Sequence, residues 1–314
     1  MDQPMSLDRN NRVAAAPFSR WRKYGFYYVM LLPAIVCFLL FEYAPMYGVL
    51  MAFKNYRFVD GILGSPWVGF EYFEQFFNDI FFWRIIRNTL MISGLHLLFG
   101  FPAPIVLALL LNEVFHSKFK RIAQSLSYLP HFMSWVILAA ILVELLSPSR
   151  GVVNYLITLF GGSPIHFLAE PHMFIGVLVI SHVWQGIGWG SVVYLAAIAG
   201  ISQDQYESAT IDGANRFKQM LYITIPSLVP IMTILFILNI GKIMNAGFDQ
   251  IFNLYNPAVY SVADIIDTYV YRIGLLEAKY GFATAIGLFK NMIGLVLVIG
   301  TNYIVKRFNE HGIW

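Results

Sequence analysis

Apolar and polar positions alternate along this chain in long blocks. Apolar runs cover approximately residues 24–53, 88–111, 122–146, 173–199, 227–248 and 283–305. Each run is long enough for a helix to cross the hydrocarbon core of a bilayer, which takes about 20 residues. Because the chain has 314 residues and no long polar block, we expect one all-α integral membrane domain with six transmembrane helices over residues 24–305.

The two ends of the chain differ from this domain. Residues 1–23 are polar and contain Pro4 and Pro17, so we expect a mostly disordered tail, and residues 306–314 form a second tail. The first apolar run is too long for a signal-peptide core and has no small-residue cleavage site, which favours a membrane span. Pro33 and Pro45 predict kinks within it.

Two shorter helices are expected outside the spans. Phe70, Phe73, Phe77 and Phe81 recur at helical spacing with acidic residues between them. This pattern predicts an amphipathic helix, which either lies in the outer membrane interface or packs on its own protein. A small apolar helix is expected near residues 152–160.

The polar loop over residues 200–226 carries the clearest local signals. Ser202 followed by Gln205 forms a capping-box pattern, so a helix should begin at Gln203. Gly213 is placed to end that helix in a left-handed cap, and Asn215 can cap a second helix. A short polar helix, a glycine elbow and a second helix between two spans suit contact with something outside the bilayer. The alternative is an ordinary loop.

Composition supports a membrane protein and excludes several classes of function. Hydrophobic residues make up 58% of the chain and charged residues 12%, unlike a soluble domain. The net charge of +3 is too small to argue for a nucleic-acid partner, and one cysteine, Cys37, allows no internal disulfide. The histidines show no metal-ligand spacing. The sequence has no GxxxxGK[ST] motif, so we expect no ATP binding of the P-loop type.

The basic residues predict the orientation in the membrane. Those on one side are Arg9, Arg12, Arg20, Arg22, Lys23, Lys118, Lys120, Arg121, Arg216, Lys218, Lys306 and Arg307. Those on the other side are fewer and spread over longer loops: Lys54, Arg57, Arg84, Arg87, Arg150, Arg272 and Lys279. The positive-inside rule therefore places both termini and the 200–226 loop in the cytoplasm.

Polar residues within the spans are costly and are functional hypotheses for that reason. They are Glu144, His182, Gln185, Asn239, Lys242, Asn245, Lys290 and Asn291. For Glu144, Lys242 and Lys290 the favoured interpretation is that they reach a membrane interface or pair within the protein.

The 200–226 loop resembles a known family motif. Glu207-Ser208-Ala209, Asp212-Gly213-Ala214 and Ile225-Pro226 are similar to the EAA coupling loop of ABC importer permeases, with Ser208 and Ile225 in place of the usual Ala and Leu. In that family the loop inserts into a cleft on a separate ATP-hydrolysing subunit. The resemblance implies ATPase coupling for the residues Glu207, Ser208, Ala209, Asp212, Gly213 and Ala214. Alternatively, Glu207 is only solvated and Asp212 only stabilises the elbow.

The resemblance extends over nearly the whole chain. GSPWVGFEYFEQFF, GFDQIFNLYNPAVYSVADIIDTYVYRIGL and the final GIW are similar to the LplB-type branch of carbohydrate permeases. That branch implies the type I importer, or MetI-like, fold in the cytoplasmic membrane of a bacterial cell. It also implies a second permease subunit in a heterodimer, two ATP-binding subunits, an extracellular solute-binding protein and an oligosaccharide substrate. ATP and magnesium would then bind the partner ATPase subunits, and this chain would have no cofactor and no catalytic residue.

An oligosaccharide substrate directs attention to amides beside aromatic rings, because sugars present hydroxyls on their edges and C–H groups on their faces. The fourth and fifth spans supply His182, Trp184, Gln185, Trp189, Asn239 and Asn245. Residues 182, 185 and 189 follow i, i+3, i+7 spacing and are expected on one helix face. The alternative is that the tryptophans are lipid-facing anchors and the amides bond neighbouring helices.

Two other function classes explain the sequence less well. An ion-driven secondary transporter would require internal repeats and a buried acid for ion coupling, and no convincing repeat is present. A membrane enzyme would require a catalytic cluster at an interface, whereas the histidines and acidic residues are scattered. The ion-driven class also leaves the 200–226 loop unexplained.

Overall fold

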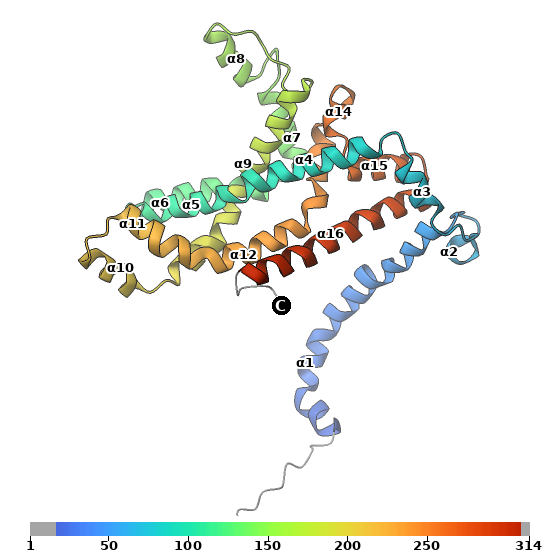
Figure 1. Ribbon diagram of the computed structural model, residues 1–314, viewed down its shortest axis with the longest axis horizontal. Helices are drawn as coiled ribbons and strands as arrows, with labels where there is room; N and C mark the ends of the chain where they lie inside the picture. Colours follow the sequence, from blue (N-terminus) through green and yellow to red (C-terminus); the bar gives the residue numbers. More distant parts are fainter. Residues whose placement is uncertain (1–16, 309–314) are drawn as a thin grey trace, which may run out of the picture. The chain divides into compact units, whose positions relative to one another are not determined.

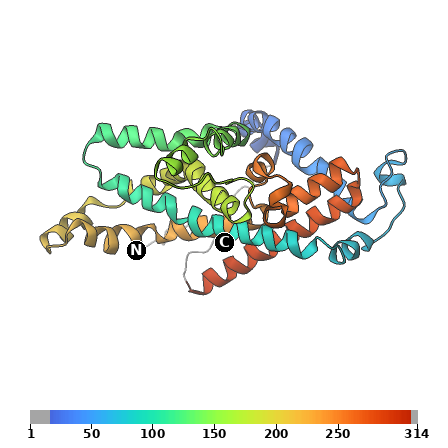
Figure 2. The same cartoon turned by 90° about the horizontal axis from the view of Figure 1, so that it is seen from above.

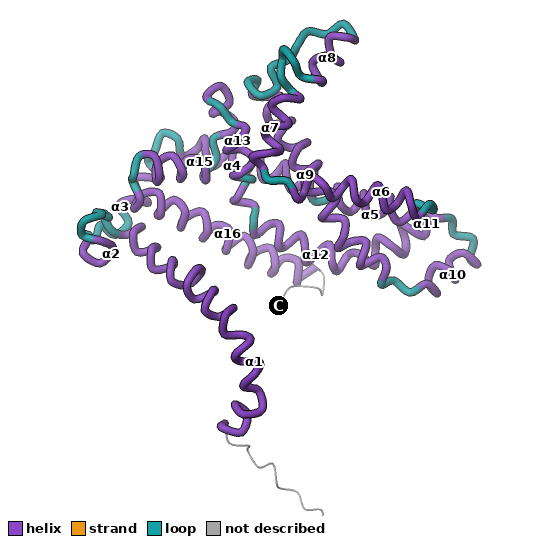
Figure 3. Tube along the Cα trace, turned by 180° about the vertical axis from the view of Figure 1, so that it is seen from behind, coloured by secondary structure: helices purple, strands orange, loops and turns teal. Residues whose placement is uncertain are grey.

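The computed structural model describes residues 17–308, which form helices joined by loops (Figure 3). Residues 1–16 and 309–314, which include most of both predicted tails, lie outside the described residues. Within the described residues, β-structure is limited to one isolated bridge between Lys54 and Trp67. The chain divides after Leu50 into two compact units, and each is described by itself.

The first unit contains an apolar α-helix that changes to π-helical and then 3-10 geometry at its C-terminal end. Helix α1 (Pro17–Phe38) begins inside the predicted tail and continues through Pro33. A π-helical turn, η1 (Leu39–Tyr43), and a 3-10 helix, η2 (Ala44–Phe53), follow it. Pro45 has no N–H to donate to the preceding turn, which explains the change of hydrogen-bond register at this point. Residues 24–53 are apolar enough to cross a membrane, as predicted.

The second unit carries the remaining predicted spans, and all of them coincide with helices. By length and composition the described chain has five candidate membrane spans, or up to six if a bent pair counts as one. In the second unit these are α4 with α5 (Phe82–Gly100, Pro102–Glu113), α6 with α7 (Ser117–Tyr128, Trp135–Leu145), α9 (Pro171–Ala199), α12 (Ile225–Gly241) and α16 (Tyr280–Phe308).

The third predicted span is not one straight helix. Helix α6 passes into a 3-10 turn, η3 (Leu129–Phe132), and α7 then leaves it at an angle of 105°. Pro130 cannot continue the helical hydrogen bonds, and the Ser134 side chain accepts from the Ile137 N–H to begin a new helix. The apolar run concealed this break because both halves are hydrophobic.

Helix α9 is the centre of the second unit, where it packs against α4, α5 and α6. Phe174 and Leu178 of α9 are fully buried together with Ile92 of α4 and Ile251 of α13 (Phe248–Leu254). Helix α12 lies beside α16 (Figure 1). In Figure 2 this unit has α3 (Glu71–Phe77) at one end and α10 (Gln203–Ile211) with α11 (Arg216–Gln219) at the other.

The predicted amphipathic helix is α3, and it packs on its own protein. Phe76 is buried and makes edge contacts with the rings of Phe282 and Phe289 on α16. Phe70, by contrast, is 73% exposed. These contacts favour the second of the two interpretations given above for this helix. The small helix near residues 152–160 is also present, as α8 (Val152–Leu159).

A buried carboxylate fixes the short helices at the α3 end. These are α14 (Tyr260–Ala263) and α15 (Ile266–Tyr271), followed by the π-helical turn η7 (Arg272–Leu276). The Asp264 side chain is fully buried and accepts from Arg84 at 3.2 Å, Arg272 at 2.8 Å and Thr268 at 2.9 Å. Because Arg84 belongs to α4, this cluster ties α4 to the α14–α15 segment.

Tyr269 adds a second tie at this end, since its hydroxyl donates to Asp79 at 2.5 Å. Burial and this hydrogen bond raise the pKa of the Tyr269 phenol. The neutral phenol is the stabilised form, so its contribution to stability is complete below the ordinary phenol pKa of about 10. The contribution is lost as the pH rises through the higher folded-state pKa.

Candidate functional site

The polar loop begins as predicted. Helix α10 starts at Gln203, and the Ser202 hydroxyl accepts from the Asp204 N–H at 3.3 Å. The full capping box is not formed, because the Gln205 side chain makes no reciprocal bond to Ser202 among the described contacts. One side-chain cap is therefore sufficient to start this exposed helix.

Gly213 forms the elbow of the loop. Its φ angle is +77°, in the left-handed region that favours glycine. The Ala214 N–H donates to the Ala209 carbonyl at 2.8 Å and the Gly213 N–H donates to Thr210 at 3.0 Å. These two bonds make a Schellman cap, and the predicted left-handed cap is confirmed.

The second helix of the loop is continuous with the fifth span. Asn215 caps α11 by accepting from the Lys218 N–H at 2.9 Å, as predicted. A π-helical turn, η4 (Met220–Thr224), then leads directly into α12. Pro226 has no N–H for the carbonyl one α-turn earlier, which explains the wider turn. No non-helical segment therefore separates the second helix of the loop from α12.

Side-chain contacts also attach the loop to α5. Arg216 forms an ion pair with Glu113 at 3.6 Å, and its guanidinium lies 3.9 Å from the Phe115 ring centroid. Within the loop, the hydroxyls of Tyr206 and Thr224 are 2.9 Å apart. The loop is thus connected to two spans, α5 through Arg216 and α12 through the continuous helix.

The outer face of the loop combines carboxylates with exposed apolar side chains. Ile211 is 87% exposed and Phe217 is 65% exposed. Glu207 and Asp212 are exposed, and their carboxylates make no hydrogen bond within the described residues. Asp212 therefore does not stabilise the elbow by accepting backbone N–H groups. Exposed apolar residues at a polar elbow are typical of a surface that contacts another protein.

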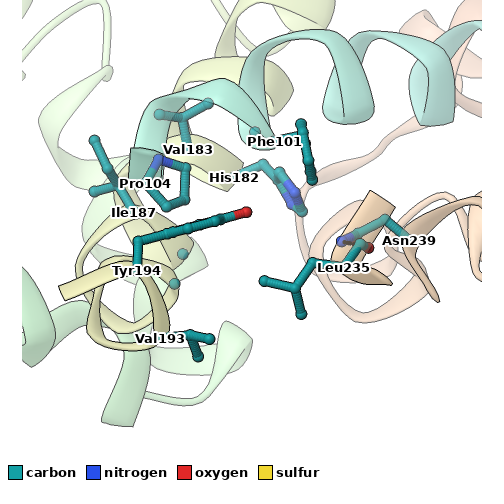
Figure 4. A pocket seen from close by; sticks show the side chains of 12 residues that line it. Phe101, Pro104, His182, Val183, Ile187, Val193, Tyr194, Leu235 and Asn239 are labelled. Carbon is teal, nitrogen blue, oxygen red and sulfur yellow. Dashed lines mark hydrogen bonds between the residues drawn. The ribbon is translucent and has the colours of Figure 1, made fainter. Parts of the chain in front are cut away.

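A cavity of about 230 Å³ lies among α4–α5, α9 and α12. Its lining consists of Gly100, Phe101, Pro104, His182, Val183, Gly186, Ile187, Gly190, Val193, Tyr194, Leu235 and Asn239. Figure 4 shows the Tyr194 hydroxyl pointing into the cavity, with His182 and Asn239 on the far side. The wall is mostly apolar with a few polar groups, as in many ligand sites.

An adjoining hollow of about 260 Å³ shares part of this lining. It has in common Gly100, Phe101, His182 and Asn239, and it adds the polar side chains of Ser93, His96, Lys242 and Asn245. Asn239, Lys242 and Asn245 are exposed in the isolated chain, so this part opens on the protein surface. We call the two hollows together the transport cavity.

Two histidines form part of the wall. The rings of His96 and His182 are stacked with centroids 3.9 Å apart and an angle of 4° between planes. Gly100 leaves room for them, because a Cβ there would come within 3.2 Å of the His182 ring. Among the described residues no group of three or more His, Cys, Asp or Glu could hold a metal ion.

The predicted pathway residues separate into two groups. His182, Asn239 and Asn245 line the transport cavity, whereas Trp184, Gln185 and Trp189 do not. Trp189 instead stacks on His131, with centroids 4.9 Å apart, and is 49% exposed. Helical spacing alone predicted that residues 185 and 189 would share a face with His182. The face of α9 that lines the cavity instead continues from His182 through Gly186 and Gly190.

Ser93, His96 and Tyr194 line the cavity and were not expected from the sequence. Each is a single polar group in an apolar run, and only the packing of α4 and α5 against α9 brings them together.

Two of the three charged residues in the predicted spans form ion pairs within the chain. Lys290 pairs with Asp267 at 2.6 Å, and Glu144 pairs with Arg150 at 3.8 Å. Pairing within the protein is confirmed for these two residues.

Comparison with known proteins identifies the family. Residues 100–310 match the family described as binding-protein-dependent transport system inner membrane component. Protein LplB of Bacillus subtilis (strain 168) is 45% identical over 287 residues, which cover 91% of this chain and 90% of that protein. The polygalacturonan/rhamnogalacturonan transport system permease protein YteP of the same organism is 43% identical, with coverage of 91% and 89%.

A solved structure shares both the sequence and the fold. The crystal structure of a bacterial alginate ABC transporter, in complex with its alginate pentasaccharide-bound periplasmic protein, contains a chain that is 42% identical. The TM-score is 0.87, and the match covers 95% of this chain and 99% of that chain. The chain therefore belongs to the binding-protein-dependent transport system inner membrane component family, and it has the MetI-like fold of ABC transporter permeases.

Proposed function

We propose that this chain is one of two permease subunits of an ATP-dependent importer for oligosaccharide fragments of a polysaccharide. The similar proteins are named for polygalacturonan, rhamnogalacturonan and alginate transport, which supports a substrate of this kind. The comparisons give no support to the ion-coupled alternative. The second permease, two ATPase subunits and a solute-binding protein complete the proposed assembly, and the similar solved transporter is bound to a periplasmic protein.

The observation that carries the proposal is the geometry of the 200–226 loop, which we call the coupling loop. The loop presents exposed Glu207, Ile211 and Asp212 at a rigid glycine elbow, and it is connected to α5 and to α12. Closure of an ATPase dimer on this surface would therefore move two spans that border the transport cavity. In this proposal ATP and magnesium bind the partner subunits, and the chain itself supplies no catalytic residue.

Coupling residues are assigned by position. Glu207, Ser208, Asp212 and Gly213 are exposed at the elbow, whereas Ala209 and Ala214 are half-buried and support it. The positive-inside rule supports a cytoplasmic location for this end and for both termini.

Transport then proceeds by alternating access, in which ATP and the loaded binding protein stabilise different conformations. The transport cavity is open on the surface of the isolated chain, and we propose that the second permease covers that opening. His182, Asn239 and Asn245 contact the sugar in this proposal. Trp184 is 41% exposed. In this proposal Trp184, Gln185 and Trp189 do not contact the sugar.

Cross-linking tests the docking of the loop directly. In a Cys37→Ser background, a cysteine at exposed Ser208 should cross-link to the ATPase subunit in the assembled transporter. A cysteine at exposed Ser149, in the loop before α8, is the matched control and should not. Cross-linking from Ser149 but not from Ser208 would overturn the assignment of the loop.

A further inference from the structure

Lys242 differs from the other charged residues of the predicted spans. Lys290 and Glu144 have partners within the chain, as described above. The Lys242 ammonium, in contrast, makes no ion pair and no hydrogen bond with any described residue. It lies at the end of α12 and lines the transport cavity.

An unpaired cation within a membrane-spanning segment is costly, and such residues commonly mark the path of a substrate or ion. The surroundings of Lys242 do not neutralise it. Neither hollow of the transport cavity has an Asp or Glu in its lining. The cavity therefore offers a positive charge and no negative one, which favours an anionic ligand over a neutral one.

The same hollow contains polar groups that lack partners. Ser93 Oγ and His96 Nε2 are buried with no hydrogen-bond partner, and the two residues are only 5% and 7% exposed. Buried polar atoms are nearly always satisfied, by protein, by water or by a ligand. Asn239 donates to the Leu235 carbonyl and keeps its amide oxygen free, and the Asn245 side chain makes no bond within the described chain.

We propose that Lys242 is the charged centre of a carboxylate-binding subsite that takes the uronate groups of an acidic oligosaccharide. Ser93, His96 and Asn245 bind the neighbouring hydroxyl and ring oxygens. This inference rests on the proposed function and deepens it, because it names the class of substrate and the residue that selects it. A similar solved transporter imports the acidic polysaccharide alginate, which is consistent with this class.

Uptake by the complete transporter in proteoliposomes tests the subsite. The probes are radiolabelled trigalacturonate and its neutral trimethyl ester, the latter at millimolar concentration. Each variant is compared with the unaltered protein for the same probe, so preferences of the solute-binding protein cancel. Lys242→Gln should lower uptake of trigalacturonate by about tenfold or more, as expected for loss of a hydrogen bond between charged groups. It should leave uptake of the ester within about twofold.

Two further variants complete the comparison. Lys242→Arg keeps the charge and should retain most trigalacturonate uptake. Lys279→Gln removes an exposed lysine that pairs with Glu277 outside the cavity, and it should transport both probes normally.

Several outcomes would overturn the subsite. One is unchanged uptake of trigalacturonate by the Lys242→Gln variant. Another is an equal loss of uptake for both probes, because Lys242 would then pair with an acidic residue of the partner permease and would not select a charged substrate. If the unaltered protein does not take up the ester, equal losses in the Gln and Arg variants overturn the inference. If the unaltered transporter takes up neither probe with ATP, the proposed function fails instead.

Discussion

Gly213 is the residue on which the shape of the coupling loop depends most directly. A side chain at φ +77° costs roughly 1–2 kcal/mol, and a β-branched one more. We expect Gly213→Val to leave the protein in the membrane but to distort the elbow, so that sugar-stimulated ATPase activity falls severalfold while basal activity persists. ATPase assays of the reconstituted transporter measure this.

Gly161 provides a matched control for that substitution. It ends α8 with φ +85°, and its N–H donates to Thr158 while Gly162 donates to Ile157, as in the cap at Gly213. Gly161→Val therefore carries similar strain at a helix end far along the chain from the coupling loop. Equal loss of stimulation in both variants would show general destabilisation and would contradict a specific role for Gly213.

Local signals explain which residues could be predicted from the sequence. The caps at Ser202, Gly213 and Asn215 depend on neighbours within a few positions, so their patterns were sufficient. The transport cavity depends on four segments distant in sequence, and the sequence identified His182 and Asn239 but not Ser93 or His96. The spacing argument for Gln185 and Trp189 lacked the packing of α6 and η3 against α9, which determines the arc that faces the cavity.

At the scale of elements, Arg216 joins the coupling loop to α5. Arg216→Gln removes both the ion pair with Glu113 and the contact with Phe115, whereas Glu113→Gln removes only the ion pair. Exposed pairs contribute about 0.2–1 kcal/mol, so we expect a two- to fivefold loss of sugar-stimulated ATPase activity, larger for Arg216→Gln. Combining Glu113→Arg with Arg216→Glu should recover part of the loss from either change.

The pair Arg150–Glu144 is the control for this prediction, because it is also exposed but joins the end of α7 to the loop before α8. Neutralising it should not change ATPase stimulation. The proposed connection between loop and α5 is wrong if the charge-swapped double variant is no better than the single variants.

The Asp264 cluster should determine the stability of the α3 end. Asp264→Asn leaves Arg84 and Arg272 without their buried carboxylate, and breaking a buried pair typically costs about 3–5 kcal/mol. We expect the Tm of the detergent-solubilised protein to fall by several degrees. Glu277→Gln, which alters an exposed pair with Lys279, should change it little. Similar Tm values for both variants would show that the cluster is dispensable.

Element boundaries were predictable where hydrophobic runs coincide with helices, as for α9 and α16. The bend between α6 and α7 was not, because its two halves form one apolar run and the break depends on Pro130 and the Ser134 cap. The contact of α3 with α16 was only partly within the pattern. Phe77 of the predicted aromatic stripe contacts Phe289, whereas Phe76, which is buried against the same ring, lies outside the stripe.

At the scale of the whole molecule, the orientation in the membrane is a prediction from charge. With Cys37 replaced by Ser, a single cysteine at Ser202 should be protected from a membrane-impermeant maleimide in spheroplasts or protoplasts, whose cytoplasmic membrane is intact. A cysteine at Ser149 should react; both sites are exposed on the protein. Buried Ser65 is unsuitable, being 4% exposed. Labelling of Ser202 from outside would reverse the proposed topology.

In the proposed function, this chain converts ATP hydrolysis on partner subunits into sugar import. The most direct measurement is oligosaccharide uptake by proteoliposomes that contain the two permeases and the ATPase subunits, with ATP inside and solute-binding protein outside. We predict uptake that requires ATP and the binding protein, and that is unaffected when ionophores collapse proton and sodium gradients. Uptake that proceeds without ATP and stops when an ion gradient collapses would contradict the proposed function.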